Sequence, residues 1–184
     1  MALTVFLPIL AFVALAAGLV VVFRRTDRIV ARARENAKFR VTVRDLAARI
    51  DVSLDGATGR IDSVRHHVLP PVALADTLIA AADAVERYIE EARALTPPPG
   101  AKAVRSALVG DLERAGRAIA MVEHGATILV SVRRGNRELE GQTSIKRGYL
   151  NLLHAREAIA RHAAIADDLE TTAKDQADVL RRSV

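Results

Sequence analysis

The sequence contains no cysteine, which excludes disulfide bonds, cysteine nucleophiles and thiolate metal sites. Tryptophan is also absent, and aromatic residues make up only 3% of the 184 residues. Glycine and proline are few and clustered, whereas alanine and leucine, which favour helices, are abundant. We therefore expect an all-α protein, with too few strand-forming residues to support a sheet.

Motifs that would identify a reaction are missing as well. There is no G-x-S-x-G elbow, and the segment Gly135–Gly148 (GNRELEGQTSIKRG) lacks the G-x-x-x-x-G-K-[ST] order of a phosphate-binding loop. The adjacent acids Glu90–Glu91 and Asp167–Asp168 are interpreted as solvated helix faces rather than catalytic pairs. We expect no enzymatic activity and no cofactor.

The chain opens with a long apolar run, Ala2–Phe23, that contains no charged side chain. A helix of this length spans roughly 33 Å, close to the ~30 Å hydrocarbon core of a bilayer. A cleaved signal peptide is the alternative, but no Lys or Arg precedes the run. We predict a retained transmembrane anchor over residues 1–23, in which Ala14 and Gly18 form a small-residue pair that could let two anchors approach.

A basic juxtamembrane helix is expected over residues 24–42. The stretch from Arg24 to Arg49 contains nine Lys and Arg residues and three acidic residues. Its net charge is therefore +6, compared with +5 for the whole chain. By the positive-inside rule, this predicts a single-pass protein of the inner or plasma membrane, with its N-terminus outside and its C-terminal domain in the cytoplasm. Arg24, Arg25, Arg28 and Arg32 are candidate contacts to anionic lipid. Nucleic acid is not expected as a partner, because no aromatic platform accompanies the charge.

From residue 43 to residue 184, apolar residues recur in alternating steps of four and three, the spacing of coiled-coil seams. The first seam contains Val43, Ala47, Ile50, Leu54, Ala57, Ile61, Val64 and Val68, and the second contains Leu74, Leu78, Ala81, Val85, Tyr88, Ala92 and Leu95. The third contains Leu108, Leu112, Ala115, Ile119, Val122, Ala126 and Leu129, and the looser fourth contains Ile145, Tyr149, Leu152, Ala155, Ile159, Ala166, Leu169, Ala173 and Leu180. The sequence therefore predicts a cytoplasmic antiparallel bundle of about four coiled-coil-like helices, continuous with the anchor.

Three breaks separate these helices. Leu69-Pro70-Pro71 and Thr96–Gly100 are clear stops because proline cannot continue a preceding helix. The third, at Gly135-Asn136, is less certain, and Thr143-Ser144 is a candidate cap for the last helix. Within the first seam, Gly56 and Gly59 are a candidate kink or hinge.

His154, Glu157 and His162 are the only candidate metal ligands, and we expect no metal there because a site normally needs three or four converging ligands in a recognisable pattern. The preferred interpretation of His162 is a partly buried bundle histidine with one hydrogen-bond partner.

In its general plan, and in the tract Ile50-Asp51-Val52-Ser53-Leu54, the chain resembles the bacterial LemA family, whose members carry an I-D-V-x-L tract after an anchor. The basic-pair D-L-I-P stretch that follows in that family is replaced here by Asp55–Ile61. The resemblance implies a membrane-attached helical protein without an established catalytic site.

These observations favour a membrane-anchored scaffold or accessory subunit whose bundle binds a protein partner or a second copy of the chain. A signalling element that uses the glycine hinge is the first alternative. A metal-binding or ligand-binding bundle is the second.

Overall fold

The computed structural model describes the backbone of residues 2–131 and 137–182, and the side chains of residues 19–21, 23–27, 30–131 and 137–168. The described chain consists of four α-helices and one short 3-10 helix, without a strand. The predicted all-α class is therefore confirmed. The chain forms two compact units, Met1–Lys38 and Phe39–Val184.

The first unit consists of helix α1 (Ala2–Arg65) up to Lys38. Large apolar side chains on this helix are exposed, including Leu19 at 54%, Val21 at 65% and Phe23 at 61%. Within the described part of the chain, no helix is both long and apolar enough to cross a membrane. The predicted pair Ala14 and Gly18 lies outside the described side chains.

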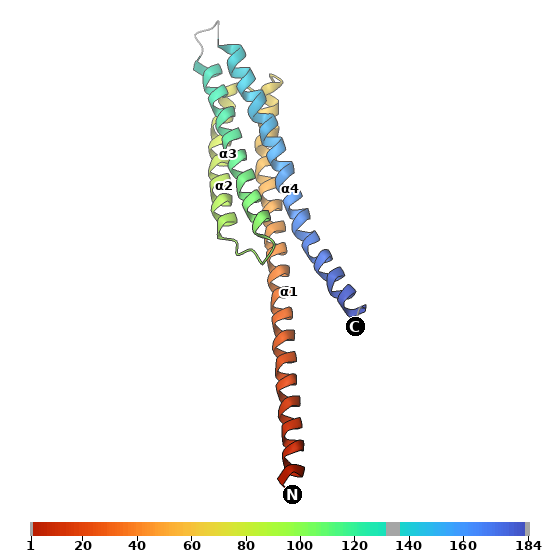
Figure 1. The fold of residues 1–184 in the computed structure, drawn as a ribbon. Helices are drawn as coiled ribbons and strands as arrows, with labels where there is room; N and C mark the ends of the chain where they lie inside the picture. The colour runs from red at the N-terminus through yellow and green to blue at the C-terminus, as the bar shows by residue number, and fades with distance from the viewer. Residues whose placement is uncertain (1, 132–136, 183–184) are drawn as a thin grey trace. The chain divides into compact units, whose positions relative to one another are not determined.

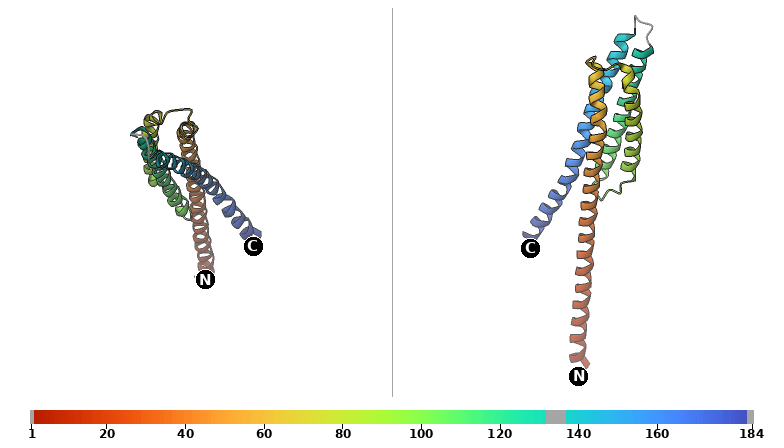
Figure 2. Two further views of the ribbon diagram at one scale, coloured as in Figure 1. Left: turned by 90° about the horizontal axis from the view of Figure 1, so that it is seen from above. Right: turned by 180° about the vertical axis from the view of Figure 1, so that it is seen from behind.

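The second unit is a four-helix bundle. It contains α1 from Phe39 onward, a 3-10 helix η1 (Pro71–Leu74), α2 (Ala75–Ala94), α3 (Lys102–Ser131) and α4 (Glu138–Arg182). Successive helices run in opposite directions, as both side views show (Figures 1 and 2). The prediction of an antiparallel bundle with four helices is thus confirmed for this unit.

The predicted seams form the core of the bundle. Every first-seam residue from Val43 to Val64 is at most 7% exposed, and the described residues of the other seams are buried or partly buried. Val68 is the exception, at 73% exposed, because α1 ends three residues earlier at Arg65. Phe39, at 4% exposed, extends the first seam by one step of four towards the N-terminus.

A left-handed turn at His67 ends α1. The Val68 amide donates to the Ser63 carbonyl at 2.8 Å and the His67 amide donates to the Val64 carbonyl at 3.0 Å, the two bonds of a Schellman motif. His67 has φ of +58°, the left-handed conformation usually taken by glycine at this position. The chain then leads through Pro71, the first residue of η1, into α2.

The second connection follows the prediction, because α2 ends at Ala94, Gly100 has φ of +94° and α3 begins at Lys102. The third predicted break, at Gly135-Asn136, lies outside the described residues, and α3 ends before it at Ser131. The predicted cap at Thr143-Ser144 is wrong, since α4 already begins at Glu138. Ser144 instead lies inside α4, where its hydroxyl donates to the Met121 carbonyl of α3 at 2.8 Å.

Three glycines bring α3 and α4 into backbone contact. A Cβ added to Gly125 would lie 2.6 Å from the Gly141 carbonyl oxygen, and one added to Gly148 would lie 2.7 Å from the Ala118 carbonyl oxygen. Real Cβ atoms do not approach other atoms so closely, so only glycine allows these helices to pack at this separation. We call Gly125, Gly141 and Gly148 the glycine contact.

The candidate hinge glycines have a different setting. Helix α1 passes through Gly56 and Gly59 as uninterrupted α-helix, both residues are exposed, and a Cβ at either would meet no atom within 4 Å. Flexibility at these two positions stays a prediction.

Candidate functional site

The three residues considered as metal ligands do not form one cluster. His154 and Glu157 are exposed on α4, and Glu157 pairs with Arg161 at 3.8 Å, whereas the side chain of His162 is only 15% exposed. Among the described side chains, no group of three His, Asp or Glu residues is placed to hold a metal ion.

His162 binds a buried carboxylate that the sequence analysis did not identify. Its Nε2 lies 2.6 Å from Oδ2 of Asp111 on α3, and the Asp111 side chain is 2% exposed. An ionised carboxylate only accepts hydrogen bonds, so Nε2 is the donor. Arg114, one turn along α3, pairs with the other carboxylate oxygen, Oδ1. The interpretation of His162 as a partly buried histidine with one partner is confirmed.

Each of the other three helix interfaces also contains a polar contact. Arg156 on α4 donates to Asp51 at 2.7 Å and to Thr58 at 2.9 Å, which ties α4 to α1. Between α2 and α3, Arg93 donates to Glu113 at 2.8 Å.

At the contact between α1 and α2, Arg49 forms a bidentate ion pair with Glu91. The distance from Nη1 of Arg49 to Oε2 of Glu91 is 3.1 Å, and Nη2 donates to Oε1. The hydrogen bonds that Arg49 donates to Glu91 raise the pKa of Arg49 above its ordinary value, and those that Arg93 donates to Glu113 and Glu90 do the same for Arg93. These guanidinium groups therefore stay charged throughout the neutral range. With Asp111–His162, these contacts place a polar pair at each of the four helix interfaces.

A partly enclosed pocket of about 240 Å³ lies where α1 ends, η1 begins, α3 ends and α4 begins. We call it the end pocket. Its apolar lining comes from all of these elements and consists of Val64, Leu69, Pro71, Leu129 and Ile145.

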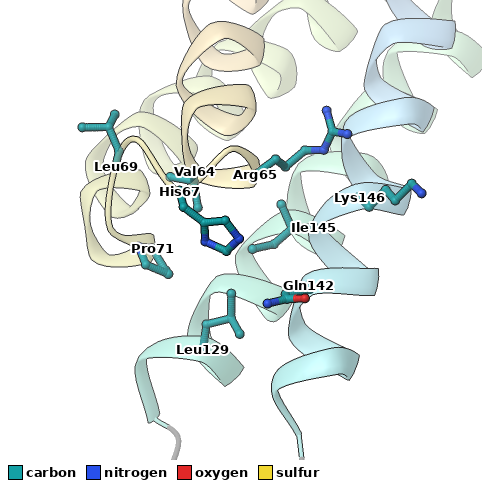
Figure 3. Close-up of a pocket in the computed structure, with 9 residues that line it drawn as sticks. All are labelled: Val64, Arg65, His67, Leu69, Pro71, Leu129, Gln142, Ile145 and Lys146. Atoms are coloured by element: carbon teal, nitrogen blue, oxygen red, sulfur yellow. The ribbon is translucent and has the colours of Figure 1, made fainter.

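The polar lining of the end pocket is cationic or neutral and contains no carboxylate. It consists of Arg65, His67, Gln142 and Lys146. Figure 3 shows the His67 ring projecting between Pro71 and Ile145, while the charged ends of Arg65 and Lys146 extend on the other side of Ile145. The Arg65 guanidinium lies 4.3 Å from the centroid of the Tyr149 ring and donates to Asp62 at 2.7 Å, so its position is fixed.

The predicted lipid-facing residues Arg24, Arg25 and Arg32 are exposed, and Arg28 lies outside the described side chains. The tract behind the family resemblance contributes to the bundle. Ile50 and Leu54 are fully buried, Asp51 binds Arg156, and the Ser53 hydroxyl lies 2.8 Å from the Tyr88 hydroxyl of α2.

Comparison with known proteins identifies no relative: no family model, no curated protein and no solved structure matches the chain. The LemA resemblance therefore stays a prediction.

Proposed function

We propose that this chain is a non-enzymatic, single-pass membrane scaffold or accessory subunit whose bundle binds a protein partner or a second copy. The uncharged run Ala2–Phe23, followed directly by Arg24 and Arg25, is the observation that carries the proposal. Leu19, Val20, Val21 and Phe23 are all more than half exposed, on different sides of α1. A helix that is apolar all round and not covered by protein suits lipid rather than a one-sided protein core.

The polar groups of the bundle support a structural role. Asp111 and His162 satisfy each other, and Arg156 is engaged by α1. Catalytic acids and bases need access to a substrate, whereas these groups are occupied in helix–helix contacts. The exposed helix faces are therefore the parts of the bundle that remain available for another protein.

Topology can be tested with single cysteines, because the chain has none of its own. Ala2→Cys should react with a membrane-impermeant maleimide from outside intact cells, and Ser106→Cys, on the exposed side of α3, only after permeabilisation. Leu15→Arg should release the chain from carbonate-washed membranes, since a charge at mid-span costs about 3 kcal/mol of insertion free energy. Leu15→Val is the matched control. Equal retention of both variants would refute the anchor.

The partner can be sought by cross-linking in native membranes, followed by mass spectrometry of species joined to the bundle. One reproducible complex would support an accessory subunit, and links between copies would support a homo-oligomer. Intramolecular links alone would contradict the scaffold proposal.

A signalling role is a second candidate, favoured by one observation. Gly56 and Gly59 each disfavour the helix by about 1 kcal/mol, yet neither permits a close contact. Flexibility of α1 would be a reason for both glycines. Replacement of both by alanine should then suppress amide exchange around residues 54–61, and unchanged exchange would contradict the hinge.

A further inference from the structure

We propose that the end pocket binds a small organic carboxylate, with the apolar body of the ligand inside and its carboxylate at the rim. This inference is independent of the scaffold proposal, because it concerns a site within the bundle. It rests on the lining of the pocket, the state of its cations and the conformation of His67.

The lining matches an anion with an apolar body. Leu129 and Ile145 form part of an apolar wall, and the side chains at the rim are cations or donors. About 240 Å³ is slightly below the roughly 300 Å³ at which drug-sized ligand pockets begin, so the ligand is small. A neutral ligand would leave the cations unused, and a cation would be repelled.

The two cations at the rim, Arg65 and Lys146, retain N–H groups that can donate hydrogen bonds to a ligand. Asp62 engages only Nη1 of Arg65, and stacking on Tyr149 holds the guanidinium in place. In the described part of the chain, Lys146 has no hydrogen bond or ion pair, and its exposed ammonium lies on the same side as Arg65 in Figure 3. Because a guanidinium and an ammonium both bind carboxylates well, we expect Arg65 and Lys146, which both line the pocket, to hold the carboxylate of the ligand.

The backbone conformation of His67 also supports a ligand site in the end pocket. A non-glycine residue in the left-handed conformation is strained, and glycine would terminate α1 without that strain. The side chain that glycine would remove is the imidazole in the pocket wall (Figure 3). Histidine at this position therefore retains an imidazole in the pocket despite the backbone strain.

The test uses the full chain in lipid nanodiscs, labelled with 3-fluorotyrosine and titrated with benzoate. The chain has only two tyrosines, so Tyr149, under Arg65, reports on the end pocket while Tyr88, hydrogen-bonded to Ser53, is an internal control. Benzoate should shift the fluorine resonance of Tyr149 saturably and leave that of Tyr88 unchanged. Benzyl alcohol and inorganic phosphate, which each lack half of the required chemistry, should bind at least about tenfold more weakly.

Two variants test whether the Tyr149 resonance shift comes from benzoate bound in the end pocket. Lys146→Gln and His67→Gly should each weaken benzoate binding about tenfold, and His67→Gly should do so while raising the melting temperature, which separates binding from folding. Arg147→Gln, the neighbouring residue outside the end pocket, is the matched control and should bind normally. Absence of a saturable Tyr149 shift, an equal shift with benzyl alcohol, or normal binding by both variants would overturn the proposal. The membrane and cross-linking experiments would be unaffected by that failure.

Discussion

The glycines of α3 and α4 differ from those of α1 in what surrounds them. Gly125 and Gly148 face the backbone of the opposite helix at distances that no Cβ allows, whereas Gly56 and Gly59 face solvent. The same residue therefore acts in opposite ways on stability. In the glycine contact it permits packing that outweighs its poor helix propensity, and in α1 it only weakens the helix.

The largest effect should come from filling the glycine contact. Gly125→Ala and Gly148→Ala should each destabilise the bundle by about 1–3 kcal/mol, and the double variant by more, because backbone atoms must move apart. Thermal unfolding of the full chain in detergent, followed by circular dichroism, measures this.

Gly110→Ala is the matched control on α3, because a Cβ there meets no atom within 4 Å. It should be neutral or stabilising. If Gly125→Ala behaved like Gly110→Ala, the two helices would not depend on glycine for their contact.

Loss of the buried Asp111–His162 hydrogen bond should come next. His162→Ala leaves Asp111 buried with Arg114 as its partner, and should cost about 1–3 kcal/mol. His154→Ala, an exposed position on the same helix, should change stability by less than about 0.5 kcal/mol. Equal melting temperatures for the two variants would mean that the Asp111–His162 contact contributes little.

Replacement of the α1 glycines by alanine should change stability in the opposite direction. Gly56→Ala and Gly59→Ala should each stabilise the bundle by up to about 1 kcal/mol, because alanine is the better helix former and the added methyl meets nothing. Urea unfolding would measure the gain. A loss of stability would show that the exposed face of α1 makes contacts of its own.

The smallest effect should come from Arg49 and Glu91. Both side chains are about two-fifths exposed, so a double-mutant cycle with Arg49→Gln and Glu91→Gln should give a coupling below about 1 kcal/mol that shrinks in high salt. The raised pKa of Arg49 means that the arginine side of this pair is lost only in strong base, as the pH passes the folded pKa. A coupling that is insensitive to salt would contradict a solvent-screened pair.

The seams were predictable from the sequence because a narrow apolar stripe repeats in steps of four and three. The glycine contact was missed although its spacing was present: Gly141, Gly148, Ala155 and His162 follow one another every seven residues on α4. A step of seven returns to nearly the same face of a helix, so Gly141, Gly148 and Ala155 mark a stretch of small residues that is followed on that face by His162. Small residues on one helix face predict a close helix–helix contact only when the residues of the opposing helix are also known.

Asp111 could not be found in the same way. On α3 it lies seven residues before Ala118 and fourteen before Gly125, on the face that meets α4. A carboxylate in a heptad ordinarily indicates a solvated position, and its burial depends on a histidine 51 residues away in the sequence. The end pocket was hidden for a related reason, since its lining comes from the ends of four elements and the left-handed residue in its wall is a histidine rather than a glycine.

The glycine contact also affects how the bundle responds to temperature. Glycine and alanine bury little apolar surface, so separation of α3 from α4 exposes less of it than separation of two leucine-rich helices would. The heat capacity of unfolding, typically about 12–15 cal/mol/K per residue and due mainly to newly hydrated apolar surface, should therefore be reduced. A smaller heat capacity flattens the curve of unfolding free energy against temperature, and a bundle with such an interface should lose less stability on cooling.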